Sequence, residues 1–170
     1  MLLPLSLLFV GAVLVSNGLW MLGKIADREV AVINFVAAGV TGTVALLGMI
    51  HEVDRSGVRD AALTLLFTVT YLWVGVNRLT GADGRGLGWF SLFVSISVIP
   101  EAVRVLASAT SAMDLWLGLS WVAWSGLWFL FFLNQALERP LGRLTALATL
   151  TSGVVTAWLP AIVLLYGSTS

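Results

Sequence analysis

Three tryptophans recur at helical spacing in the second half of the chain. Trp121, Trp124 and Trp128 stand three and four residues apart, and Phe131 and Gln135 continue the series. At about 100° per residue these five side chains share one face of an α-helix. Indole rings are flat and rigid, and each carries one N–H donor and no charge. Such a stripe either fills space between helices or forms one wall of a narrow path for a flat, uncharged solute.

The other polar groups inside apolar segments are neutral as well. They are the amides and hydroxyls of Asn17, Asn34, Thr70, Tyr71, Asn77 and Thr156. In hydrocarbon each group must find a hydrogen-bonding partner, so any one of them can act as glue between helices. A path lined by such groups favours a small polar solute and rejects ions, because it cannot replace their hydration shell.

Charge inside the apolar segments is confined to Glu101 and Arg104, which are three residues apart and therefore share a helix face. We expect them in the outer part of their helix. There they form either an interfacial pair that reaches towards the lipid–water boundary or a pair that lines a vestibule. A proton pump would need a relay of carboxylates deeper in the membrane, and the sequence has none.

The composition excludes several classes of protein. Hydrophobic residues make up 59% of the chain and charged residues 11%, whereas a soluble domain has about a quarter charged residues. A net charge of zero gives no basic patch for nucleic acid. The absence of cysteine and the single histidine exclude disulfides, thiolate chemistry and a multi-histidine metal site. We predict a membrane protein that is not an enzyme and that has no catalytic residue, metal or cofactor.

Six apolar segments position these residues, at about 2–22, 30–50, 61–77, 87–107, 114–137 and 144–166. Each is long enough to cross a bilayer as a helix. The first lacks the basic n-region and cleavage site of a signal peptide, so we expect it to remain as a spanning helix. The prediction is an all-α membrane protein whose residues 1–170 form a single six-helix domain.

The charged loops predict an orientation in the membrane. The loops after the first, third and fifth segments hold Lys24, Arg28, Arg78, Arg85, Arg139 and Arg143; the opposite side holds Arg55, Arg59 and Arg104. The side richer in lysine and arginine is normally cytoplasmic. Both termini are therefore expected outside.

Each odd-numbered segment carries a candidate lining face. These faces are Val10, Leu14, Asn17 and Met21 in the first segment; Phe67, Tyr71 and Val74 in the third; and the tryptophan stripe in the fifth. A faint internal period of about 55–60 residues, one helical hairpin per unit, relates them. Three hairpins around an axis would place the three faces opposite one another.

Short motifs in all six segments carry a resemblance to a known family. In chain order they are Ser16-Asn17-Gly18, Asn34-Phe35, Thr70-Tyr71-Leu72 with Asn77, Trp89-Phe90-Ser91-Leu92-Phe93-Val94 with Ile99-Pro100, the tryptophan stripe with Pro140-Leu141-Gly142, and Thr156-Ala157-Trp158 with Pro160-Ala161. In these residues the chain resembles the AmiS/UreI family of urea and short-chain amide channels over its whole length.

The resemblance implies a bacterial inner-membrane protein of three helical hairpins. It also implies a homo-oligomer, a hexameric ring with a pore in each protomer and membrane lipid at its centre. The family's narrowest points carry over to Val10, Leu14, Phe67, Tyr71, Trp121, Trp124, Leu127 and Trp128, and Asn17 shares the face of the first two.

One departure from the family bears on gating. Acid-gated members have a long, histidine-rich outer loop between helices two and three, whereas here residues 50–60 hold His51 alone. This weakens the case for acid gating and favours the amide-linked branch.

We therefore predict a passive channel for urea and short aliphatic amides. A cytosolic urease or amidase would consume the solute and so keep its concentration gradient directed inward. A proton-coupled secondary transporter of short amides and a membrane scaffold with packing tryptophans are the alternatives. The sequence does not decide between urea and amide.

Overall fold

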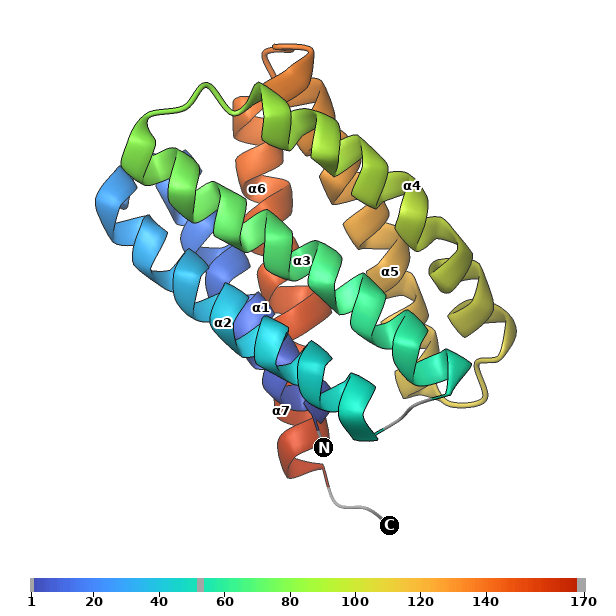
Figure 1. Cartoon of the computed structure of the whole chain (residues 1–170). Coiled ribbons are helices and arrows are strands. Elements are labelled where there is room, and N and C mark those ends of the chain that lie inside the picture. Colours follow the sequence, from blue (N-terminus) through green and yellow to red (C-terminus); the bar gives the residue numbers. More distant parts are fainter. Residues whose placement is uncertain (1, 52–53, 168–170) are drawn as a thin grey trace.

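The chain folds into a bundle of six helices, each long and apolar enough to cross a membrane (Figure 1). A computed structural model describes residues 2–51 and 54–167. The first four helices are α1 (Leu2–Met21), α2 (Asp27–His51), α3 (Arg55–Thr80) and α4 (Arg85–Ala107). The fifth is α5 (Ala112–Phe131) with η1 (Phe132–Ala136); the sixth is α6 (Gly142–Ser152), η2 (Gly153–Trp158) and α7 (Leu159–Tyr166). The all-α fold with six membrane helices is confirmed.

The bundle has two distinct ends. The start of α1 and the end of α7 lie towards the bottom of Figure 1, together with the end of α2, the start of α3 and the α4–α5 loop, and we call this the terminal end. The α1–α2, α3–α4 and α5–α6 loops lie at the opposite end, which we call the far end. All three loops with excess lysine and arginine are at the far end.

The third helix begins earlier than its apolar residues suggest. Asp54 is its N-cap, and the Asp54 carboxylate accepts a hydrogen bond of 2.9 Å from the backbone N–H of Gly57. This cap lets a polar first turn continue the helix outwards from the predicted start near residue 61. The added turns matter because Gly57 and Asp60 line the large cavity described below.

Two helices contain π-helical turns, η1 and η2, which the apolar pattern does not reveal. Pro160 follows η2 and has no N–H to donate to the preceding turn. The Trp116 indole N–H donates to the carbonyl of Val155 at 2.9 Å, so a carbonyl within η2 is satisfied by a side chain from α5. The π turns thus widen the helix without leaving this polar group unpaired.

The closest helix pairs are α2 with α3, α4 with the fifth helix, and α1 with the sixth. Glycines permit the last of these contacts. A Cβ atom on Gly18 would lie 2.7 Å from the Leu150 Cβ, and a Cβ atom on Gly11 would lie 2.9 Å from the backbone nitrogen of Trp158. This close crossing fixes α1, and with it Leu14 and Asn17, against the rest of the bundle.

Candidate solute path

Four aromatic rings meet in the middle of the bundle. Phe67 from α3 stacks on Trp128, with ring centroids 4.5 Å apart and planes at 19°. Its ring also meets Trp124 edge to face at 5.4 Å and Trp121 in a tilted contact at 5.6 Å. We call these four residues the aromatic cluster. It is made entirely of uncharged side chains, and Phe67, Trp124 and Trp128 are buried.

Hydrogen bonds fix the Trp124 ring of the cluster, whereas the hydroxyl of Tyr71 on α3 has no partner among the described residues. The Trp124 indole N–H donates to the Thr156 hydroxyl at 2.7 Å, and that hydroxyl donates to the Ser152 carbonyl at 2.6 Å. Thr156 lies in η2, so the π turn positions the tryptophan. Tyr71 is also buried. A polar solute or a water molecule beside its hydroxyl would satisfy this group.

A large cavity occupies the terminal end of the bundle. Its volume is about 490 Å³, and side chains from α1 to α5 line it. Trp121 and Trp124 form its inner limit. We call this cavity the chamber. It is wide enough for a small solute to retain much of its hydration shell.

Glu101 belongs to the wall of the chamber. Its side chain is only 5% exposed. The carboxylate accepts two hydrogen bonds from Arg104, one from Nε at 2.9 Å and one from a terminal guanidinium nitrogen, and it lies 3.3 Å from Nε of Arg59 on α3. The two arginines are about half and one-third exposed. Glu101 and Arg104 both line the chamber, and the contact of Glu101 with Arg59 links α4 to α3.

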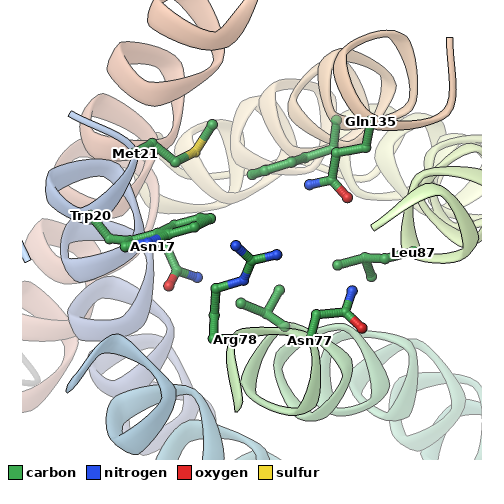
Figure 2. A pocket seen from close by; sticks show the side chains of 9 residues that line it. Asn17, Trp20, Met21, Asn77, Arg78, Leu87 and Gln135 are labelled. Carbon is green, nitrogen blue, oxygen red and sulfur yellow. The ribbon is translucent and has the colours of Figure 1, made fainter. Parts of the chain in front are cut away.

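Two smaller cavities, each of about 30 Å³, continue beyond the aromatic cluster. The central cavity is lined by Leu14, Asn17, Thr70, Tyr71, Val74, Leu87, Ser91, Leu127, Trp128 and Phe131. The far cavity is lined by Asn17, Trp20, Met21, Val74, Asn77, Arg78, Leu87, Phe131 and Gln135 (Figure 2). The two share Asn17, Val74, Leu87 and Phe131, so they adjoin.

The three cavities therefore follow one another along the bundle and are interrupted at the aromatic cluster. Trp121 and Trp124 face the chamber, Trp128 faces the central cavity, and Phe67 lies between them against all three rings. The stack of Phe67 on Trp128 closes the connection in this structure.

Seven of the nine residues expected from sequence line one of these cavities; the exceptions are Val10 and Phe67, and Phe67 packs against the three tryptophan rings. Leu14, Asn17, Tyr71, Leu127 and Trp128 line the central cavity. Val10 is buried in the apolar core and lines none of the three cavities. The structure adds Leu87 and Ser91 from α4. Ser91 belongs to a motif already noted, but α4 has no aromatic stripe that would have marked this face.

Asn17 and Asn34 form a reciprocal amide pair. Asn34 donates to the Asn17 oxygen at 2.7 Å, and Asn17 donates to the Asn34 oxygen at 3.2 Å. Asn34 also donates to the Val30 carbonyl at 2.8 Å, which anchors the pair. A primary amide has two N–H donors and an oxygen with two lone pairs, so Asn17 keeps one donor and one acceptor site for the cavities that it lines.

The narrowest part of the path is built from uncharged side chains. Within the described residues no three His, Cys, Asp or Glu side chains come together as a metal site. The bundle and its cavities define a multi-pass membrane protein with an uncharged constriction between two wider regions. The chain matches the model of the AmiS/UreI family of transporters over residues 2–168 and belongs to that family.

Known relatives fall into two groups. The chain is 38% identical, over 96% of its length and 76% of the relative, to a protein of Mycolicibacterium smegmatis named as an amidate substrates transporter. It is 34% identical to the acid-activated urea channel of Helicobacter pylori, over 94% of this chain and 95% of that one. The closed-state cryoEM structure of the H. pylori urea channel superposes with a TM-score of 0.87 at 32% identity, covering 96% of this chain and 97% of that chain.

Proposed function

We propose that the protein is a passive channel for urea and short aliphatic amides such as acetamide. One observation carries the proposal: the chamber and the two adjoining smaller cavities are separated by a contact that is built only of uncharged aromatic rings. Such a constriction cannot replace the hydration shell of an ion. A flat solute with few hydrogen-bonding groups loses much less on entering it.

Passage requires the stack at the constriction to open. Phe67 and Trp128 are 4.5 Å apart by their centroids. A planar solute between two rings needs roughly 7 Å, twice the usual contact distance of about 3.5 Å. Rotation of the Phe67 side chain supplies this space. Trp124, tied to Thr156, remains as the fixed wall, and the Tyr71 hydroxyl offers a hydrogen bond on the far side.

The same proposal covers the assembly and its setting. We place the protein in the bacterial plasma membrane with both termini outside and the far end in the cytoplasm, as the lysine and arginine bias suggests. The protomers form a hexameric ring, each with its own path. A cytosolic urease or amidase consumes the solute and keeps its gradient directed inwards.

Acid gating is not part of the proposal. His51, the single histidine of the chain, is exposed at the end of α2. The match to the H. pylori urea channel extends over 187 residues, more than the 170 of this chain, so that channel contains insertions that this chain lacks. Histidine is the side chain that ordinarily changes charge between pH 5 and 8, and a steep switch requires several.

Solute flux into vesicles tests the proposal. Purified protein in lipid vesicles should conduct urea and acetamide at rates that change less than about threefold between pH 7.5 and 5, with no dependence on a proton gradient. Flux that is driven by a proton gradient would establish a coupled transporter. Flux no greater than in protein-free vesicles would contradict the channel proposal and favour a membrane scaffold.

A further inference from the structure

The far cavity is lined by amide side chains, one of which has a buried oxygen without a partner. Asn77 is 4% exposed and lines the cavity from α3. The Gln135 side-chain oxygen is buried and has no partner within the described part of the chain. Figure 2 shows the Gln135 amide directed into the cavity from the fifth helix, opposite α3, which carries Asn77 and Arg78. A buried amide group without a partner destabilises the fold unless a water molecule or a solute hydrogen-bonds to it.

Arg78 brings fixed donors to the same cavity. Its guanidinium lies over the Trp20 ring at 4.7 Å from the centroid, and the Trp20 indole N–H donates to Asp27 at 2.6 Å. No carboxylate of the described residues lies within ion-pair distance of Arg78. The stacking fixes the plane of the guanidinium and leaves its edge free to donate. In Figure 2 that edge points into the middle of the cavity.

These groups match the hydrogen-bonding pattern of a planar primary amide. Such a solute has one carbonyl oxygen that accepts and one or two NH₂ groups that donate. The Arg78 edge supplies donors for the oxygen, while the Gln135 and Asn77 oxygens supply acceptors for the NH₂ hydrogens. Asn17, held by Asn34, adds one further donor and acceptor. A monovalent cation is repelled because the site carries the positive charge of Arg78.

The size of the far cavity agrees with this occupant. Its volume is about 30 Å³, whereas a single water needs about 10–15 Å³ measured in the same way. Roughly two waters therefore fit, and a solute of four heavy atoms enters by displacing them with a small widening at the flexible Met21 side chain.

We propose that Asn77, Arg78 and Gln135 form a binding subsite for the planar amide group of the solute at the far end of the path. In this subsite the Arg78 guanidinium donates hydrogen bonds to the carbonyl oxygen of the solute. The inference rests on the proposed channel function and adds a second place of selection beyond the aromatic cluster.

Paired solutes test the role of Arg78. Urea and thiourea have the same shape, but sulfur is a much weaker hydrogen-bond acceptor than oxygen. Arg78→Met should lower the ratio of urea to thiourea permeability in vesicles about fivefold, the factor expected for one lost hydrogen bond. Arg78→Lys keeps the charge but loses the planar fork, and should give an intermediate ratio. Arg143→Met, which removes an exposed far-end charge outside the cavity, should leave the ratio at the wild-type value.

The acceptors have their own readout. Gln135→Leu should raise the urea concentration at half-maximal flux by about fivefold, because the solute NH₂ loses its acceptor. Oligomer size and melting temperature of each variant, measured on the same preparations, separate these effects from misfolding.

Two outcomes would overturn the subsite. In the first, Arg78→Met conducts both solutes faster at an unchanged urea to thiourea ratio, which would mean that Arg78 merely obstructs the path. In the second, all variants keep the wild-type permeability ratio and the wild-type urea concentration at half-maximal flux. In either case wild-type flux remains, so the channel proposal stands; absent wild-type flux would remove both.

Discussion

The chamber and the aromatic cluster adjoin, but the chamber wall carries charged side chains and the cluster consists of uncharged rings. The chamber has about 490 Å³ and a wall that carries Glu101 and Arg104. The aromatic cluster has uncharged rings in direct contact and no room for water between Phe67 and Trp128. Charges are tolerable where water fits and expensive where it does not. On the proposed channel function, a solute would keep its water in the chamber and lose it first at the neutral aromatic cluster.

The two regions are also held together by different forces. Beside the chamber the ion pair of Glu101 with Arg59 links α4 to α3, and Arg104 of α4 pairs with the same carboxylate. At the cluster, ring contacts and the Trp124–Thr156 hydrogen bond set the geometry. Changes in the cluster should therefore alter which solutes pass, whereas changes in the chamber should alter stability and leave selection intact.

The largest effect is expected from Trp128→Ala. This change removes the stacking partner of Phe67 and joins the chamber to the central cavity. Discrimination between urea and larger amides should fall at least about tenfold, because the narrowest point loses the ring that stacks on Phe67. Competing permeabilities in vesicles, expressed per folded protomer, measure it.

A matched tryptophan serves as the control. Trp89 on α4 is 55% exposed and lies outside the three cavities, so Trp89→Ala should leave selectivity unchanged. If Trp128 were packing alone, its removal would cost about 3–5 kcal/mol of stability and leave selectivity intact. That outcome would erase the contrast between the two regions.

The second effect concerns the chamber. Glu101→Gln leaves Arg59 and Arg104 facing one another across the α3–α4 contact without the carboxylate. We expect a loss of about 1–3 kcal/mol, below the full value for a buried pair because both arginines are partly exposed. Thermal unfolding of the purified protein measures this loss.

Selection in Glu101→Gln is the sharper readout. The ratio of urea to acetamide permeability should stay within about twofold of the wild type, since the chamber does not strip water from the solute. Arg85→Met, at an exposed far-end pair with Asp83, is the control for loss of a surface ion pair. A large change in selectivity in Glu101→Gln would make the chamber a selecting element and contradict the division of roles.

Much of this arrangement was predictable because its signals are local. The six spans follow from uninterrupted apolar runs, and the single face of Trp121, Trp124 and Trp128 follows from helical periodicity. The structure adds what depends on distant partners. The inward direction of Glu101 depends on Arg59 from another helix, and the π turn that positions Thr156 adjoins Pro160 and is supported by Trp116. The local sequence pattern does not predict either of these contacts between distant residues.

The same reasoning explains the missed residues. Leu87 and Ser91 line the central cavity although α4 presents no periodic aromatic or amide face. Arg78 reads in sequence as an ordinary charge after an apolar run, and only its position over Trp20 brings it to the far cavity. Loop charges are assigned to solvent by default, so residues at the ends of a path are the hardest to predict.

The smallest effect is expected at the rim of the chamber, from Asp54. The backbone N–H of Gly57 and the Ser56 hydroxyl bond its carboxylate, and they lower the pKa of Asp54 below its ordinary value of 3.8. The folded state therefore binds the proton less readily than the unfolded chain. The resulting stabilisation is complete above the ordinary pKa and is lost as the pH falls through the lower, folded value.

Two substitutions separate the cap from the charge. At pH 7, Asp54→Ala should lower the melting temperature by a few degrees, whereas Asp54→Asn, which still accepts from the Gly57 N–H, should remain near the wild type. At pH 3 the gap between wild type and Asp54→Ala should narrow because the carboxylate is becoming protonated. Neither variant should change the urea to acetamide ratio, since α3 begins beside the chamber and far along the helix from Phe67. A gap that widens at pH 3 would show that the cap is not the source of the effect, and a shifted solute ratio would show that the chamber rim takes part in selection.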